Sequence, residues 1–565
     1  MPQWGSNAQS PAPLHYSSSS SSERMYCAAM PNLFSEQHYI QVVINGSLRT
    51  VTAEQRDNME TGDLLIPTAI PQNLPSDLAF DEIAFTNEQR YLAAYWTWLH
   101  PLYPVVHKPT FTLAGASPLL RAAMLALGAH MLQTSVDMEN ARMVHERCTK
   151  ILKRRNIDGS HTFRVCDMQA ILLIEIYSIF KARRPPLQFS KIYLEVYSRL
   201  AGDHQALSQD TANWLHDNPM QTNDFMEESY EGAFGNLDAK CRQRLLIACY
   251  ILDQQHATLF GRLRTTCMVV PGMNLPFARS QDYWDAPPEQ QLEIRYQRQS
   301  AGIPCYDQVF QAMSALPSMT ETAEEPHDTF RSSLMLACFA DPNNDLEAYG
   351  CAPDSDMVPS NILLAIEQSP CMRLAFHTHM LCKYTPMRDL LCVAGESWCM
   401  AEKLSSLEEY SRAQKVALDW AKGTITEPGS DTASVQRALY HARQILDIHR
   451  KHPKTGLLYH EWAIYLAAVV FWARAYCCPR RRPRLSIPSP TEPRKSMHEL
   501  EKTVSVLIDG ETTMITWNEA ASVLLWTKTQ IDKVNVPHNC GLTNGALDVL
   551  GRLATRGNEG SLFGE

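Results

Sequence analysis

Apolar residues spaced three and four positions apart dominate this chain from about residue 88 onward, and this helical period constrains the fold more than any other feature. Alternating strand patterns are scarce over the same stretch. The segment from Val165 to Phe180 is apolar on most of its faces, as a helix at the centre of a large bundle is. The sequence therefore predicts an all-α fold, built as a large multi-helix domain with loop insertions.

Prolines and capping residues mark where the predicted helices begin and end. The first helix is expected to end at Pro101 and Pro104. Its buried face is predicted to consist of Tyr91, Tyr95, Trp98, Leu99 and Leu102. Ser117 followed by Pro118 indicates the next helix start, because a capping hydroxyl precedes a proline in the first turn. Further helices are predicted at about 245–259, 361–382, 401–420, 433–450, 460–476, 516–531 and 542–555.

Composition divides the chain into four parts. Residues 1–84 contain the run Ser17–Ser22, several prolines and no lysine, which favours a flexible N-terminal arm with room for one short ordered patch. Residues 85–476 form the main helical domain, with an acidic loop or insertion at about 202–238. That insertion is either plain surface or a segment that offers its aromatic residues to a partner. Residues 477–498 are a basic, proline-rich linker, and 499–565 are a C-terminal helical segment expected to pack on the main domain.

Charge, cysteines and hydropathy limit the class of protein. The net charge of −10 disfavours a chain that coats nucleic acid through bulk positive charge. The 16 cysteines are scattered without close disulfide-like pairs, which favours a reducing, intracellular compartment. The most apolar stretch, Trp462 to Ala473, is shorter than the roughly 20 residues needed to span a bilayer. We expect a globular protein without a membrane segment.

Each catalytic template fails on a specific residue. His460-Glu461 begins a zinc-protease pattern, but Ile464 stands where the second histidine is needed. The chain has no glycine-rich phosphate loop, no dinucleotide fingerprint and no adjacent-aspartate motif for magnesium. His377, His379 and Cys382 carry metal-binding atoms, but the two histidines point in different directions on a helix, so a structural role is favoured. The sequence predicts no catalytic, cofactor-binding or metal-binding residue.

A basic cluster is the clearest polar signal in the chain. Arg480, Arg481, Arg482 and Arg484 lie within five positions, and Pro479 and Pro483 hold this segment extended. Nuclear import receptors read such clusters, whereas a solvated loop without a partner is the alternative. These four arginines are the candidate nuclear localisation signal.

Three segments in the same order resemble one known family. YLAAYWTWLHPLYPVVHKPTFTLAGASPLLRAAMLALGAHM (91–131) is similar to the opening of the fungal-specific transcription factor domain, or middle homology region. RLLIACYILDQQHATLFG with MNLPFARSQDYW resembles its next helix and Leu-Pro loop, and TPMRDLLCVAGESWCMAEKLSSLEEYSRAQKVALDWA resembles the subset that carries Cys2His2 zinc fingers. The matching positions are His100, Pro101, Pro104, His107, Phe111, Ser117, Pro118, Asp253, Pro276, Trp284, Trp398 and Trp420.

The resemblance implies an all-helical regulatory domain of a nuclear transcription regulator that controls a metabolic or secondary-metabolite gene set, without catalysis. Its partners would be other transcription factors or co-regulators, and a small-molecule effector is possible in such a fold. Residues 1–84 contain a single cysteine, Cys27, so no zinc finger or binuclear cluster is encoded there. DNA contact is therefore expected through a partner or a missing N-terminal module, and zinc only if an upstream finger exists. A non-catalytic metabolite or protein sensor, and a truncated regulator that sequesters others, are the alternatives.

Overall fold

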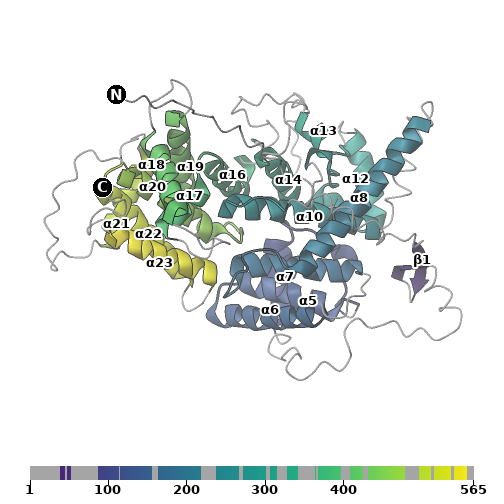
Figure 1. Cartoon of the computed structure of the whole chain (residues 1–565). Helices are drawn as coiled ribbons and strands as arrows, with labels where there is room; N and C mark the ends of the chain where they lie inside the picture. Colours follow the sequence, from purple (N-terminus) through teal and green to yellow (C-terminus); the bar gives the residue numbers. More distant parts are fainter. Residues whose placement is uncertain are drawn as a thin grey trace, which may run out of the picture. The chain divides into compact units, whose positions relative to one another are not determined.

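The computed structural model describes residues 39–44, 47–52, 87–113, 115–155, 163–217, 237–265, 272–300, 306–314, 328–341, 363, 367–395, 407–423, 431–477, 496–510, 515–535 and 540–556. The chain divides into two compact units, residues 1–73 and 74–565. The second unit holds the predicted helical domain and is the larger by far (Figure 1).

The described residues of the first unit form one antiparallel hairpin. Strand β1 (Tyr39–Ile44) pairs with β2 (Ser47–Thr52), with Tyr39 opposite Thr52 and Ile44 opposite Ser47. The sequence signal for it is Asn45-Gly46 between two runs rich in β-branched residues, a common combination in two-residue hairpins. The helical period gives no indication of this hairpin. It lies within residues 1–84, where a flexible arm with one short ordered patch was expected.

The second unit is helical in its described residues, which confirms the all-α prediction, apart from an isolated bridge between Pro276 and Gln308. Its N-terminal half contains α4 (Glu88–Ala94), the π-helix η1 (Tyr95–Leu99), the 3-10 helix η2 (Lys108–Thr110), α5 (Pro118–Met131), α6 (Ser135–Arg155), α7 (Val165–Lys181), α8 (Lys191–Asp217), α10 (Leu237–Phe260), η3 (Gly272–Asn274), α11 (Gln281–Asp285), α12 (Pro288–Ser300), α13 (Val309–Ser314) and α14 (Thr329–Ala340). Its C-terminal half contains α16 (Pro370–Lys383), α17 (Met387–Ala394), α18 (Leu407–Lys422), α19 (Asp431–Lys451), α20 (His460–Cys477), α21 (Met497–Asp509), α22 (Trp517–Asn535) and α23 (Gly541–Arg556).

Two helices without a polar face form the centres of the two halves. Helix α7 is buried from Asp167 to Phe180 except at Ser178, and α20 is buried from Trp462 to Ala473. Burial of each large apolar side chain contributes roughly 1.5–3 kcal/mol, so these two helices supply much of the hydrophobic stabilisation. No described helix is both long enough and apolar enough to cross a membrane.

Helix α10 joins the two halves. It packs on α7 and α8 on one side and on α14, α16 and α17 on the other (Figure 1). Seventeen of its residues are buried, among them Arg244 and Asp253. A helix buried this completely places polar side chains inside the protein, where each needs a partner.

The first helices pack at very close range. A Cβ atom placed on Gly128 of α5 would lie 1.9 Å from the backbone oxygen of Tyr91 in α4, so only glycine allows this approach. Tyr91, Tyr95, Leu99 and Leu102 are buried as predicted. The prediction for Trp98 is wrong, because its side chain is 39% exposed.

Helix α8 corrects one predicted boundary. The acidic stretch 202–238 was expected to be a loop or insertion, but α8 continues to Asp217 and α10 begins at Leu237. Acidic residues spaced along α8 leave the helical backbone intact, and the apolar period of its first half extends through them. Residues 218–236 lie outside the described part.

The C-terminal helices pack on the main domain. Helix α21 contacts α19, α22 contacts α20, and α23 contacts α20, α22 and α7. Helix α21 begins with a capping box, in which Ser496 Oγ accepts from the backbone N–H of Glu499 and the Glu499 carboxylate accepts from that of Ser496. The helix therefore begins two residues before the predicted boundary at 499. Residues 478–495 of the basic linker lie outside the described part.

Candidate functional site

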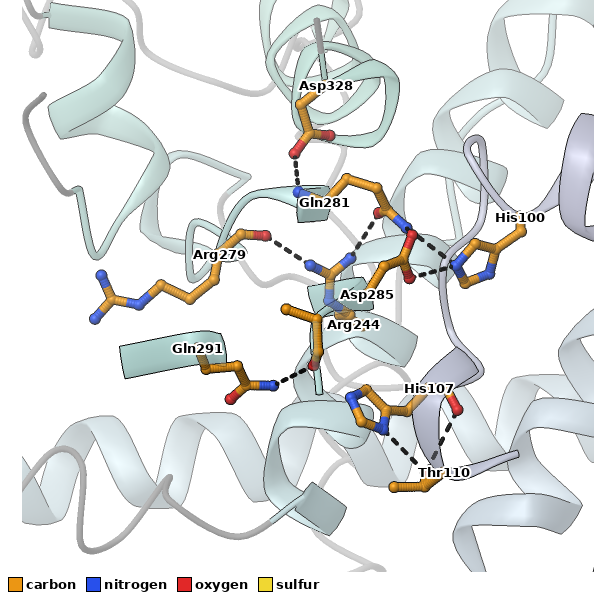
Figure 2. Close-up of polar contacts among 10 residues, drawn as sticks. His100, His107, Thr110, Arg244, Arg279, Gln281, Asp285, Gln291 and Asp328 are labelled. Atoms are coloured by element: carbon orange, nitrogen blue, oxygen red, sulfur yellow. Dashed lines mark hydrogen bonds and ion pairs between the residues drawn. The ribbon is translucent and has the colours of Figure 1, made fainter. Parts of the chain in front are cut away.

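The segment after η1 contacts α10 through Tyr103 and α11 through His100. Helix η1 ends at Leu99, and Pro101 and Pro104 prevent the helix from continuing. The chain then places His100 and His107 beside residues that follow α10 in the sequence (Figure 2). The site therefore joins two segments that are far apart in the sequence.

His100 and Asp285 form the centre of this site. The Nε2 atom of His100 lies 2.9 Å from Oδ1 of Asp285, a residue 185 positions away. The Gln281 amide donates to the other Asp285 oxygen at 2.7 Å and lies 3.0 Å from His100 Nε2 (Figure 2). Since a ring nitrogen that donates to Asp285 cannot also accept, the Gln281 amide hydrogen bond belongs to the carboxylate. Burial lowers the pKa of His100 although Asp285 raises it, so the ring is neutral at pH 7.

Arg244 supports the same cluster from α10. Its Nη2 donates to the backbone oxygen of Arg279 at 2.6 Å, and its guanidinium lies over the Trp284 ring at 4.4 Å. Burial lowers the pKa of Arg244 to about 10, which still leaves it charged at neutral pH. A cation stacked on an indole is attracted by the ring quadrupole, and this attraction strengthens when water is excluded.

Trp284 connects Arg244 to His107. The His107 ring meets Trp284 edge-on at a centroid distance of 4.7 Å, and its Nδ1 lies 2.9 Å from Thr110 Oγ1. Burial lowers the pKa of His107. Two histidines that lie seven residues apart in the motif segment thus both contact one helix, α11.

Asp328 extends the cluster to α14. Its Oδ2 accepts from the backbone N–H of Gln281 at 2.9 Å, and its Oδ1 accepts from that of Arg331 at 3.0 Å. The same carboxylate caps α14 and binds the start of α11 (Figure 2). The short helix α11 is therefore held by hydrogen bonds at both of its ends.

The contacts of this cluster bind and orient helices. A histidine–carboxylate pair activates a nucleophile only when a hydroxyl or thiol lies at the free ring nitrogen. The Nδ1 atom of His100 is buried and has no hydrogen-bond partner in the described part of the chain. The geometry supports a structural joint between the domain's opening segment and its middle.

Asp253, another family-motif position, belongs to a second buried network. It accepts from Arg264 Nε at 3.3 Å and from Thr265 Oγ1 at 3.0 Å. Arg264 also pairs with Asp341, which accepts from the Tyr250 hydroxyl at 2.9 Å. Burial raises the pKa of Asp253, and Arg264 opposes this. The network fastens the segment after α10 to the end of α14.

The remaining motif positions are dispersed. Phe111 meets Trp96 edge-on at 5.5 Å, Pro276 forms the isolated bridge with Gln308, and Trp420 Nε1 donates to the Tyr384 backbone oxygen at 2.8 Å. Pro118 is the first residue of α5, as predicted. Trp398 and the candidate signal Arg480, Arg481, Arg482 and Arg484 lie outside the described residues.

The Ser117 cap is a prediction that the structure corrects. Its side chain makes no capping hydrogen bond, and its Oγ is buried without a partner among the described residues. Pro118 leaves the first helical position without an N–H and fixes its backbone for the helix, so α5 starts without the cap.

The two histidines of the candidate metal cluster, His377 and His379, have separate hydrogen-bond partners. His377 Nδ1 lies 2.8 Å from His441 Nδ1, whereas His379 Nδ1 contacts the Ala375 backbone oxygen of its own helix. A second pair joins His449 Nδ1 to His460 Nε2 at 3.0 Å. Within the described residues, no group of three histidine, cysteine or acidic side chains is placed to hold a metal ion.

Four residues of the main cluster were not predicted from the sequence, namely Arg244, Gln281, Asp285 and Asp328. Arg244 and Gln281 lie inside the motif segments and Asp285 directly follows one of them, but nothing in the spacing indicated that they meet. One available signal was a charged residue on a helix that is otherwise apolar, since a buried charge needs a partner.

Comparisons with known proteins agree with the resemblance. Residues 92–336, the segment that contains the His100 cluster, match the model of the fungal specific transcription factor domain. The transcription factor verF of Penicillium polonicum is 42% identical over 57 residues, which are 10% of this chain and 8% of that protein.

Two longer matches are more distant. The nicotinate catabolism cluster-specific transcription factor of Emericella nidulans is 21% identical over 457 residues, covering 73% of this chain and 50% of that protein. The zinc finger protein klf1 of Schizosaccharomyces pombe is 21% identical over 211 residues, covering 37% of this chain and 26% of that protein. The chain thus matches half or less of the length of these relatives. No solved structure is significantly similar to it.

Proposed function

Starting from the fungal specific transcription factor domain at residues 92–336, we propose that this chain is a nuclear, non-catalytic transcription regulator that controls a metabolic or secondary-metabolite gene set. The match of that domain is the observation that carries the proposal. The similarity to a factor named for a nicotinate catabolism cluster favours a metabolic gene set. The His100–Asp285 cluster supports a scaffold role, because it joins helices and offers no nucleophile.

The mechanism is recruitment or masking of other factors by the helical domain. A net charge of −10 gives the chain little general attraction for DNA. We therefore propose that the base contacts come from a partner transcription factor, or from a zinc-finger segment outside these 565 residues, and that zinc belongs only to such a segment. Co-regulators are the partners expected on the helical domain.

Chromatin immunoprecipitation of the tagged chain tests the proposal. Discrete promoter peaks are expected, and they would place the chain at genes whatever supplies the base contacts. A stable, expressed chain with no enrichment at any promoter contradicts gene regulation at chromatin. That result would favour the sensor or the sequestering regulator.

Tethering separates activation from repression and from sequestration. The chain is fused to an unrelated DNA-binding domain and placed at a reporter promoter. A regulator changes reporter output in either direction, and the unfused chain is the control. Output equal to that of the DNA-binding domain alone contradicts the recruitment mechanism.

Nuclear entry is proposed to depend on Arg480, Arg481, Arg482 and Arg484. Replacement of all four by glutamine is expected to move a fluorescent fusion from the nucleus to the cytoplasm. Another basic run, Lys153-Arg154-Arg155, lies at the C-terminal end of α6, where the helix dipole favours cations. Its replacement by glutamine is the matched control and is expected to leave the distribution unchanged. Unchanged nuclear entry of the fourfold variant would show that these four arginines are not the localisation signal.

A further inference from the structure

A pocket lies where the 452–459 segment between α19 and α20 meets η1 and the ends of α5 and α7. Its wall includes Trp98, His130, Lys181, Lys454, His460 and Glu461. Its internal volume is about 40 Å³, which is room for about three water molecules. None of these residues belongs to the His100–Asp285 cluster, so the pocket is a separate feature of the domain.

A buried ion pair forms the inner wall. Lys181 Nζ lies 2.9 Å from Glu461 Oε2, and the two side chains are 7% and 13% exposed. A lysine ammonium has three N–H donors, and in the described part of the chain only the one to Glu461 has a protein acceptor. Two strong donors therefore remain available beside the pocket.

The neighbouring His460 adds no charge. Its Nδ1 lies 3.1 Å from Thr455 Oγ1, and its Nε2 lies 3.0 Å from His449 Nδ1. Burial lowers the pKa of His460 to about 4, so the ring is neutral at pH 7. The charges of Lys181 and Glu461 cancel each other. Lys454, which is exposed and also lines the pocket, adds one positive charge, so these three side chains together carry a net charge of plus one.

Trp98 forms the outer wall. Its side chain is 39% exposed, whereas Tyr95 and Leu99 of the same π-helix are buried. Gly456 lies against it with a φ of 84°, and a Cβ there would come within 3.2 Å of the indole. The glycine thus lets the loop pack on one edge of the ring while part of Trp98 stays open to solvent.

We propose that this pocket binds a small monocarboxylate. The carboxylate oxygens accept from the two remaining N–H donors of Lys181, and Lys454 balances the negative charge. The inner volume holds a carboxylate and one water but no larger group, so the organic part of the ligand lies at the mouth against Trp98. Because Glu461 opposes the approach of an anion, we expect a dissociation constant on the order of 1 mM.

Titration calorimetry on the full chain, with benzoate as the probe, tests the site. Benzamide is the matched neutral probe, because it has the same ring and shape without the charge. Benzoate is expected to bind at least tenfold more tightly than benzamide. No heat from benzoate up to 20 mM, or equal binding of the two probes, would overturn the proposal.

Variants then locate the binding. Lys454→Gln is expected to weaken benzoate binding about threefold to fivefold. Lys451→Gln is the matched control, because Lys451 is also exposed on this stretch, pairs with Asp447 and does not line the pocket. An unchanged affinity in Lys454→Gln, or an equal loss in both variants, counts against the pocket.

A double variant tests the inner donors without leaving a buried charge. Lys181→Met combined with Glu461→Leu replaces the ion pair by apolar side chains of similar size and is expected to fold. Its benzoate binding should be lost, and unchanged binding in this folded variant refutes the site. Chromatin occupancy is measured in a separate experiment, so a failure to bind benzoate does not bear on the proposal that the chain is a transcription regulator.

Discussion

Lys181→Met is expected to destabilise the protein strongly by leaving Glu461 as an unpaired buried charge. Burial alone raises the pKa of Glu461, but Lys181 and then His460 outweigh it and lower this pKa from its ordinary 4.5 to about 2. At 1.36 kcal/mol for each tenfold change in acidity, that difference corresponds to about 3 kcal/mol. Removal of one partner of a buried ion pair costs 3–5 kcal/mol in other proteins, which agrees.

Urea unfolding at pH 7, followed by far-UV circular dichroism, measures this effect on the full chain. We expect Lys181→Met to lower the free energy of unfolding by about 3–5 kcal/mol and the double Lys181→Met, Glu461→Leu variant to recover most of it. Lys451→Gln, an exposed lysine paired with Asp447, should cost less than about 1 kcal/mol. A loss under about 1 kcal/mol in Lys181→Met, or a double variant as unstable as the single one, would falsify the reasoning.

The stability of the native protein and that of Lys181→Met are expected to change in opposite directions as the pH falls. In the native protein the Glu461 pKa is lowered, so its stabilising contribution is complete above about pH 4.5 and is lost as the pH falls toward 2. In Lys181→Met the unpaired carboxyl has a raised pKa, because burial then acts without an opposing cation. The variant should therefore regain stability as the pH falls through that raised pKa, and a penalty that stays constant from pH 7 to pH 4 contradicts this explanation.

Three further predictions concern packing, the His100 site and acid stability. Gly128→Ala is expected to lower the stability measured in thermal melts by more than about 2 kcal/mol, since the added Cβ would overlap the Tyr91 backbone oxygen. Gly551→Ala is the control: its Cβ meets only the flexible end of the Lys528 side chain, so the variant should be more stable by about 0.5–1 kcal/mol. Asp285→Asn should lower the free energy of unfolding by about 1–3 kcal/mol, because it weakens the hydrogen bond to His100. Asp282→Asn on the same helix removes an exposed ion pair with Arg298 and should cost less than about 1 kcal/mol. Equal losses in the two variants would contradict the structural role of the His100–Asp285 pair. Burial lowers the pKa of both histidines of the His449–His460 pair to about 4, so the unfolded chain binds more protons than the folded chain as the pH falls. The free energy of unfolding should therefore fall between pH 7 and pH 5 by about 2 kcal/mol for each histidine, or about 4 kcal/mol for the pair, and a flat urea midpoint over this range excludes that linkage.

Local patterns predicted the helices well because a helix is specified by neighbouring residues. The apolar period of α7 and α20 and the prolines after η1 indicated these elements and their ends. The errors follow from the same local view. Trp98 has the right period for the buried face, but its exposure depends on the distant loop at Gly456.

The candidate site could be predicted only in part. The resemblance indicated His100, His107 and Trp284 as important positions, and the structure brings these three together. It does not bring Asp253 or Trp420 to the same place. Arg244 and Asp285 were missed because the pairing of a buried charge depends on which helices meet, and the spacing along one helix does not contain that information.

The sequence by itself determined the fold class, the absence of a recognisable catalytic motif and the family resemblance, since all three depend on the order and spacing of residue types. Only the tertiary structure decided which polar groups share an environment. Lys181 and Glu461 are 280 positions apart, yet their charges lie 2.9 Å apart in a wall of the pocket. The strength of that interaction comes from the exclusion of water by packed helices, and a linear sequence does not specify this property.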